Sequence, residues 1–284
     1  MTSARNLVGA GVGTDPVVRM GRVALATQGI LYVIVGFLAV QVAGGDRSAK
    51  PSQKGAIANL AHQPYGRILV GLLAVGLLMY FGWRLMLAIR GEPGDDEDGG
   101  SLAKRAANLG RGAIYASFAV VAFKLAFGSE GSGGSSGSGG GQSQQKSTAT
   151  VLSWPGGRVL VVVAGLCVIG AGLWNAYKAV TSKFEDNLDL SSLDHKQAQA
   201  VKVIGTGGYL ARGVAFALIG WFLIHAGFDK NAGETKGLDG ALRSLADSGN
   251  GRLALVAVGL GLVLFGAFRV LDGVYRRPSE IANS

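Results

Sequence analysis

The chain has 284 residues, of which 49% are hydrophobic and 16% charged, and its mean hydropathy is +0.34. This composition excludes an ordinary soluble domain and is typical of a membrane protein. The formal net charge of +9 does not indicate nucleic acid as a partner, because the basic residues punctuate apolar runs and do not form a stripe that could follow phosphates.

Six apolar segments are long enough to cross a bilayer as helices, since about 30 Å of hydrocarbon requires about 20 residues at 1.5 Å each. In chain order they cover about 23–43, 67–90, 109–128, 157–180, 207–228 and 252–275. Their apolar residues surround the whole helix circumference, as expected for helices that face lipid and one another. The sequence therefore predicts an all-α, polytopic membrane protein that forms one membrane domain.

The distribution of Lys and Arg predicts which side of the membrane each loop occupies. The N-terminal segment, the second and fourth loops and the C-terminal segment hold more of these residues than the other three loops do. We therefore expect a multi-pass protein of the cell membrane with both termini in the cytoplasm.

Three of the spans begin with Gly-Arg and, after the same spacing, reach an aromatic residue with a polar neighbour. The enclosed stretch rises about 25 Å as a helix, so the two ends should lie at opposite membrane surfaces, where arginine snorkels and indole rings prefer to lie. The expected interface anchors are Arg67, Arg158, Arg252, Trp83, Trp174, Arg84 and Arg269.

The other three spans share a different pattern, in which Gly29, Gly112 and Gly213 are each followed seven positions later by a small residue. Positions i and i+7 lie on one helix face, so each of these spans should carry a small-residue seam that a neighbouring helix can approach closely. The chain is thus predicted to contain three parallel two-helix repeats, at about 21–91, 104–181 and 202–277. A pseudo-three-fold bundle and a linear row of hairpins would both leave this pattern.

The segments outside the spans differ in kind. The first and third outer loops each end in a short helix-like stretch before Gly-Arg, and residues 129–146 have the Gly/Ser-rich composition of a flexible linker. Residues 1–20 and 278–284 are expected to form tails. The single cysteine, Cys167, excludes an intrachain disulfide and a multi-cysteine metal site.

This pattern resembles the actinobacterial membrane family known as domain of unknown function 1206 (DUF1206), whose members carry three copies of a two-helix repeat. The resemblance runs from about Gly21 to Arg277 and rests on the entrances Pro64-Tyr65-Gly66-Arg67 and Pro155-Gly156-Gly157-Arg158, and on the KGLDGALRSLA stretch. In the third copy Gly249 and Asn250 replace the proline motif. The resemblance implies a fold and membrane residence, and no activity.

Two sets of polar residues at equivalent repeat positions are candidate sites. Gln41, Lys124 and His225 lie toward the outer ends of three spans, where they could converge on an anion, a lipid headgroup or a proton path, although separate snorkelling is the simpler interpretation. Arg84 and Arg269, with Asn175 at the third equivalent position, could clamp a lipid phosphate; anchoring of the helix ends is again the simpler interpretation.

No pattern in the sequence indicates catalysis, a metal site or a cofactor, and we do not expect an enzyme. The spans contain no acidic residue except Asp272 near one end. The leading hypothesis is an integral membrane scaffold that binds lipid or another membrane protein. The alternative is a small channel or transporter with a path along the pseudo-three-fold axis.

Overall fold

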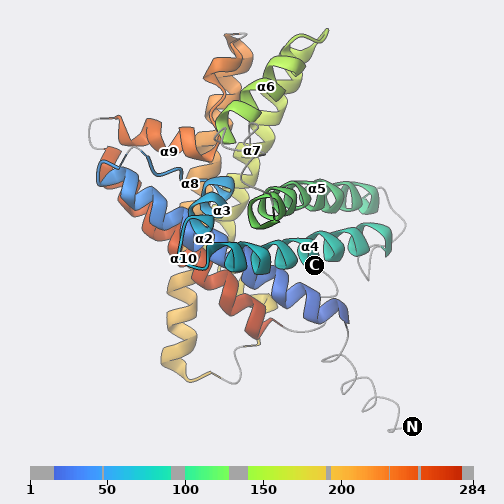
Figure 1. The fold of residues 1–284 in the computed structure, drawn as a ribbon, viewed down its shortest axis with the longest axis vertical. Helices are drawn as coiled ribbons and strands as arrows, with labels where there is room; N and C mark the ends of the chain where they lie inside the picture. Colours follow the sequence, from blue (N-terminus) through green and yellow to red (C-terminus); the bar gives the residue numbers. More distant parts are fainter. Residues whose placement is uncertain are drawn as a thin grey trace.

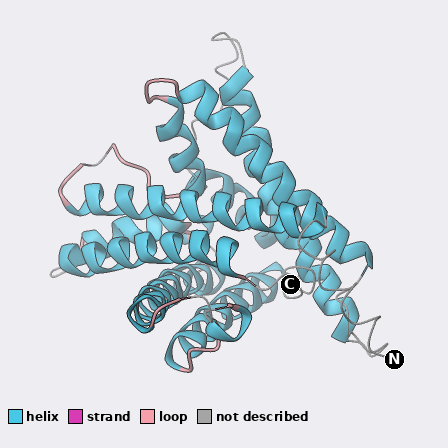
Figure 2. Ribbon diagram, turned by 90° about the horizontal axis from the view of Figure 1, so that it is seen from below, coloured by secondary structure: helices cyan, strands magenta, loops and turns pink. Residues whose placement is uncertain are grey.

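In the computed structural model, the described residues are 16–46, 48–90, 100–127, 140–189, 193–229, 231–248 and 251–276. Most of them are helical, and Figure 2 shows helices joined by short loops. The long helices are α2 (Pro16–Ala43), α4 (Gly66–Arg90), α5 (Gly100–Phe127), α7 (Gly157–Val180), α8 (His195–Phe228) and α10 (Gly251–Tyr275). All six are long and apolar enough to cross a membrane, which confirms the predicted class.

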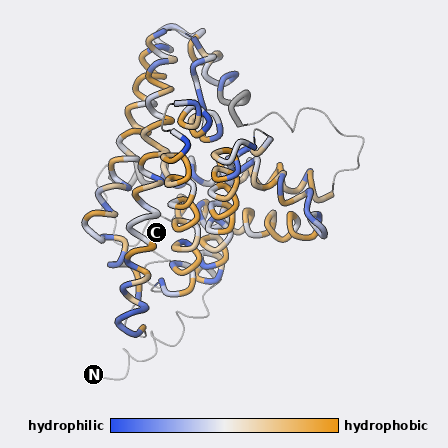
Figure 3. Tube along the Cα trace, turned by 90° about the vertical axis from the view of Figure 1, so that its left-hand side faces the viewer, coloured by the Kyte–Doolittle hydropathy of each residue, from blue (hydrophilic) through white to orange (hydrophobic). Residues whose placement is uncertain are grey.

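Shorter elements lie between the long helices. They are α3 (Gln53–Ala61), α6 (Gly140–Leu152), α9 (Leu238–Ala246) and two 3-10 turns, η2 (Glu185–Asn187) and η3 (Ala232–Glu234). The long helices are mostly hydrophobic along their length, and hydrophilic residues gather toward their ends and in the connections (Figure 3).

The helix α8 begins well before the apolar segment that the sequence marks. Asp194 caps its N-terminus by accepting a hydrogen bond from the backbone N–H of His195, and Gln197 accepts one from the backbone N–H of Asp194. This capping box satisfies N–H groups that the first turn leaves without helical partners. The helix therefore begins with a polar segment on the N-terminal side of the predicted span.

The most extensive packing joins helices of different repeats. The three closest pairs are α2 with α10, α4 with α5, and α7 with α8, and they run in three different directions across Figure 1. Each pair combines the second helix of one repeat with the first helix of the next, and the pair of α10 with α2 joins the last repeat to the first. This cyclic order excludes a simple row of hairpins.

The small-residue seams explain how closely two of these pairs approach. A Cβ added to Gly29 would lie 2.6 Å from the carbonyl oxygen of Gly266, and one on Gly213 would lie 2.9 Å from that of Gly172. In the third pair Phe81 holds the equivalent position, and a Cβ on Gly112 would stay 3.4 Å from its ring. The predicted close approach is confirmed for the seams of α2 and α8, with the partner supplied by another repeat, and α5 does not approach its partner as closely.

The ring of six helices has a break inside the second repeat. The two long helices of the first repeat, α2 and α4, pack together, as do α8 and α10 of the third repeat, whereas α5 and α7 do not pack along each other. Of the six spans, α5 and α7 have the smallest share of buried residues, although both are largely apolar. The arrangement is therefore an interrupted pseudo-three-fold ring.

Each Gly-Arg entrance begins at a sharp turn from a short helix into a span. A Cβ on Gly66, Gly157 or Gly251 would lie 2.5, 1.8 or 1.6 Å from the carbonyl oxygen six residues earlier, that of Leu60, Val151 or Leu245. No residue other than glycine fits such an approach without moving the backbone. The glycine of the repeated motif is thus required by the turn.

The prediction of a flexible linker over 129–146 is wrong for its last part, because α6 begins at Gly140. The glycine-rich composition ends there, and the following Gln, Lys, Ala and Leu residues favour a helix. The amide of Gln145 also donates a hydrogen bond to the carbonyl oxygen of Gly233, at 3.2 Å. Residues 128–139 lie outside the described residues, as do 1–15 and 278–284 of the expected tails, while α2 already begins at Pro16.

Candidate functional site

Polar residues at equivalent repeat positions meet where the three helix pairs come together. One set precedes the seam glycines (Gln28, Arg111, Arg212), and the other lies near the ends of α4, α7 and α10. We call the following group the basic centre: Gln28, Arg84, Arg111, Lys178, Arg212, Arg269, Asp272 and Arg276. It lies at the end of the bundle where α2 begins and α10 ends, since a Cβ on Gly273 would lie 3.0 Å from the carbonyl oxygen of Arg22. Gln28, Arg84, Arg269 and Asp272 are buried there, whereas Arg111 is exposed.

Arg269 is buried and held by two partners. Its Nε donates to Oε1 of Gln28 at 2.8 Å, and its Nη1 donates to Oδ2 of Asp272 at 2.6 Å. The amide of Gln28 donates in turn to the hydroxyl of Tyr115 on α5. Arg276 also approaches Asp272, with Nε 3.2 Å from Oδ1. One buried carboxylate therefore serves two guanidinium groups.

Arg84 is buried against polar and aromatic side chains. Its Nε donates to the Tyr80 hydroxyl at 3.2 Å, its Nη1 donates to Oδ1 of Asn108 at 3.0 Å, and its guanidinium carbon lies 4.5 Å from the centre of the Trp83 ring. These contacts fix the position of the cation by hydrogen bonding and cation–π attraction.

Arg212 lies against three aromatic rings. Its guanidinium carbon is 5.6, 5.0 and 4.8 Å from the ring centres of Tyr32, Phe216 and Phe265. Its Nε is shielded from solvent and has no hydrogen-bond partner among the described residues. Ring faces attract the charge but do not replace a hydrogen-bond acceptor.

Lys178 of α7 brings another cation to the same place. Arg276, Arg269, Arg212 and Arg111 all repel its ammonium group. At the edge of the centre, burial lowers the pKa of Arg276, and the Asp272 carboxylate opposes that shift. Among the described residues of the basic centre, cationic side chains outnumber the one carboxylate, that of Asp272, and the arrangement can attract an anion with several acceptor oxygens.

The chain between α7 and α8 folds back beneath the centre. The buried ring of Phe184 stacks on Tyr209 at 5.4 Å between ring centres and meets Phe268 edge-on at 5.1 Å. Leu188 forms an isolated antiparallel bridge with Arg276, and the backbone N–H of Asp189 donates to the carbonyl oxygen of Tyr275. These contacts attach the loop to the end of α10 and hold Arg276 beside Asp272.

The predicted interface anchors divide into two groups. The arginines of the Gly-Arg entrances, Arg67, Arg158 and Arg252, are exposed, and Trp174 is 54% exposed, so their anchoring role stays a prediction. Trp83, Arg84 and Arg269 are 0%, 6% and 8% exposed. Anchoring at the lipid surface is wrong for these three, because close packing of α4 and α10 against other repeats buries them in the bundle.

We call Gln41, Lys124 and His225 the outer polar set. Lys124 is exposed, Gln41 and His225 are half-buried, and no hydrogen bond connects any two of these side chains in the part of the chain that the structure describes. Nδ1 of His225 lies 3.1 Å from the carbonyl oxygen of Trp221, and the two rings are 4.3 Å apart. A shared role for the three residues stays a hypothesis.

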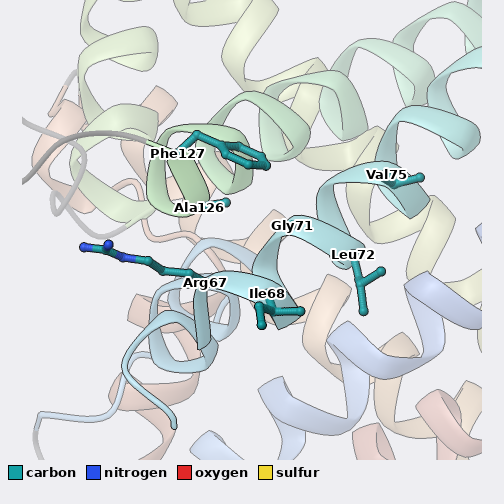
Figure 4. Close-up of a pocket in the computed structure, with 7 residues that line it drawn as sticks. All are labelled: Arg67, Ile68, Gly71, Leu72, Val75, Ala126 and Phe127. Carbon is teal, nitrogen blue, oxygen red and sulfur yellow. The ribbon is translucent and has the colours of Figure 1, made fainter. Parts of the chain in front are cut away.

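A shallow groove of about 380 Å³ lies between the beginning of α4 and the end of α5. Figure 4 shows its lining, with Arg67 at one end pointing away from the apolar residues: Arg67, Ile68, Gly71, Leu72, Val75, Ala126 and Phe127. Gly71 holds the position of Val162 in α7, whose Cγ2 would lie 2.7 Å from a Cβ on Gly227. The missing side chain leaves the groove, and its apolar lining suits hydrocarbon.

The three-fold repetition of this geometry is matched by the sequence comparison. The sequence model of the family described as Domain of Unknown Function (DUF1206) matches residues 23–91, 106–182 and 207–276, one match for each repeat. The chain belongs to the DUF1206 family. A relative in Bacillus subtilis (strain 168), "Uncharacterized protein YxxB", is 32% identical over 258 residues, which cover 91% of this chain and 90% of the relative. No solved structure matches.

The sequence contained a signal for the basic centre of this DUF1206 protein that the sequence reasoning missed. In each repeat, the residue before the seam glycine is Gln or Arg. Three residues after the polar residue that follows the framing aromatic (Arg84, Asn175 or Arg269) comes Leu87, Lys178 or Asp272. A polar residue beside a seam can point toward a helix neighbour, as the buried Gln28 does, whereas Arg111 is exposed. The pairing of helices between repeats then decides which of these positions meet.

Proposed function

We propose that this protein is an integral membrane scaffold of the cell membrane that binds the phosphate headgroup of an anionic lipid at the basic centre. It performs no catalysis, and both its termini lie in the cytoplasm. The observation that carries the proposal is the gathering of cations at one end of an apolar helix bundle, where Arg84 and Arg269 are buried and Lys178, Arg212 and Arg276 are half-buried.

Charged groups among apolar helices are costly unless opposite charge compensates them. Asp272 compensates Arg269 and Arg276 in part. A phosphate offers negative charge and several acceptor oxygens, and guanidinium groups bind it with two parallel hydrogen bonds. The Nε of Arg212, which has no acceptor among the described residues, is available for such a bond.

The position of the centre also favours a lipid as the source of the phosphate. The centre lies toward the membrane side that the distribution of Lys and Arg assigns to the cytoplasm, and the cytoplasmic leaflet carries anionic lipids. The channel hypothesis depended on the outer polar set, which the structure does not join by hydrogen bonds. No observation favours it as a second function.

Thermal unfolding in lipid nanodiscs tests this function. Phosphatidylglycerol should raise the melting temperature relative to phosphatidylcholine, because a ligand that binds only the folded state stabilises it, by about 2.7 kcal/mol at one hundred times its dissociation constant. The increment should fall by at least half in Arg212→Gln, a change that introduces the residue found at the equivalent Gln28. Arg252→Gln, at an exposed entrance, is the control and should keep the increment. Equal melting temperatures of the wild type in both lipids would contradict the proposal.

The proposed orientation predicts the labelling of two exposed positions in a Cys167→Ala background. A cysteine at Ser48, between α2 and α3, should react with an impermeant thiol reagent in intact cells, and one at Thr181, after α7, should react only after permeabilisation. The opposite labelling would show that both termini lie outside the cytoplasm.

A further inference from the structure

The break between α5 and α7 can be compared with the corresponding contact in the other two repeats. In the first repeat, a Cβ on Gly76 would lie 2.1 Å from Oγ1 of Thr27, and in the third, a Cβ on Gly261 would lie 2.3 Å from Cβ of Ala211. The equivalent residues of the second repeat are Gly110 on α5 and Cys167 on α7. A Cβ on Gly110 would meet nothing within 4 Å, and Cys167 is exposed. The second repeat therefore has the small residues of a helix contact but holds its helices apart.

The charges at a second pair of equivalent positions differ in the same way. In the first repeat these positions hold Gln28 and Leu87, which are uncharged. In the third repeat they hold Arg212 and Asp272, which carry opposite charges. In the second repeat the positions hold Arg111 and Lys178, which repel each other. The repeat whose helices are apart is the one that holds like charges at both positions: Arg111 is exposed on α5, and the ammonium of Lys178 lies 5.7 Å from the centre of the Trp174 ring on α7.

We propose that a phosphate group binds between Arg111 of α5 and Lys178 of α7, as the headgroup of an anionic lipid that enters sideways through the break, and that its binding draws the two helices together. This inference rests on the proposed function and locates its binding site. A phosphate between two cations replaces their repulsion by two attractions, each a charge-assisted hydrogen bond. The second repeat would then gain the helix contact that the other repeats already have.

A lipid fits the break better than a free anion because apolar side chains continue along the faces of both helices. Ile114, four residues after Gly110 on α5, and Val163, four residues before Cys167 on α7, are exposed. Acyl chains can cover such surface while the headgroup stays with Arg111 and Lys178. Free phosphate offers the same charge but no hydrocarbon, so the two sources can be separated.

Disulfide formation between Gly110→Cys and the natural Cys167 reports whether α5 and α7 come together, since the bond requires Cβ atoms about 3.5–4.5 Å apart. Mild oxidation is carried out in nanodiscs of phosphatidylglycerol, of phosphatidylcholine, and of phosphatidylcholine with inorganic phosphate. We expect the intramolecular disulfide to form several-fold faster in phosphatidylglycerol than in the other two. Thr27→Cys with Gly76→Cys in a Cys167→Ala background is the control, and it should oxidise equally in all three.

Lys178→Asp gives the second repeat the charge pattern of the third. In this background the Gly110→Cys disulfide should form rapidly in every lipid. Equal oxidation rates of the Lys178-containing protein in phosphatidylglycerol and phosphatidylcholine would overturn the inference, even where phosphatidylglycerol still raises the melting temperature, and the proposed function would then stand without this site. Acceleration by inorganic phosphate alone would assign the site to a free anion and overturn the assignment to lipid. Slow oxidation of Lys178→Asp in all lipids would show that like charge does not keep the helices apart.

Discussion

Leucine in place of both Gly29 and Gly36 is expected to lower the free energy of unfolding by about 2–6 kcal/mol, because overpacking costs about 1–3 kcal/mol at each position. A Cβ at these positions would lie 2.6 and 2.5 Å from the carbonyl oxygens of Gly266 and Gly259. The obstructing atoms belong to the backbone of α10, so a side-chain rotation cannot relieve the clash. The pair of α2 with α10 joins the first repeat to the third, and its loss should open the ring. Thermal unfolding in detergent measures the effect.

The matched control replaces two glycines at which an added side chain would contact few or no neighbouring atoms. A Cβ on Gly71 would only reach the Phe127 ring at 3.9 Å, and one on Gly170 would meet nothing within 4 Å. The double variant Gly71→Leu with Gly170→Leu should therefore keep the melting temperature of the wild type. Equal melting temperatures of the Gly29 and Gly36 variant and of the wild type would show that α2 and α10 do not approach at this seam.

Asp272→Asn is expected to destabilise the protein by about 3–5 kcal/mol, the range found when one partner of a buried ion pair is removed. Asp272 is 2% exposed and contacts Arg269 at 2.6 Å and Arg276 at 3.2 Å. An asparagine keeps the shape but not the charge, so two buried guanidinium groups lose their shared counter-ion. Chemical or thermal unfolding of the variant in phosphatidylcholine gives the size of the loss.

A second ion pair provides the comparison for this change. Asp239 and Arg243 on α9 are 2.9 Å apart, and their side chains are more exposed than the Asp272 pair. Asp239→Asn should cost about 1 kcal/mol or less, as is usual for pairs near solvent. The excess positive charge in Asp272→Asn should also enlarge the stabilisation by phosphatidylglycerol. A loss no greater than that of Asp239→Asn would mean that Asp272 does not compensate a buried charge.

The elements of the fold were largely predictable because each has a local sequence signal. Long apolar runs marked the six spans, and the Gly-Arg entrances and seam glycines marked the three repeats. The repeat spacing could not show that α2 would pack most extensively against α10, since a seam specifies a close neighbour but not its identity. The extent of α6 was missed because the Gly-rich stretch before Gly140 masked the helix-forming residues after it.

The candidate site was only partly predictable for the same reason. Arg84 and Arg269 were identified, but their position at the end of an apolar frame favoured a role at the membrane surface. Their burial depends on contacts with other repeats, such as the hydrogen bond from Arg269 to Gln28 of α2. Residues far apart in sequence meet there through tertiary packing, and the local pattern around each is the same for a buried cation and for an exposed one.

Native mass spectrometry of the purified protein tests the central claim most directly, because it identifies the lipids that remain bound after detergent removes the loosely associated ones. The wild type should retain anionic phospholipid in preference to zwitterionic lipid of the same membrane. The variant that combines Lys178→Leu with Arg212→Gln should lose this preference, and Arg67→Gln, in the groove between α4 and α5, should keep it. Retention of anionic lipid in equal amount by the wild type and by the Lys178→Leu and Arg212→Gln variant would contradict binding at the basic centre.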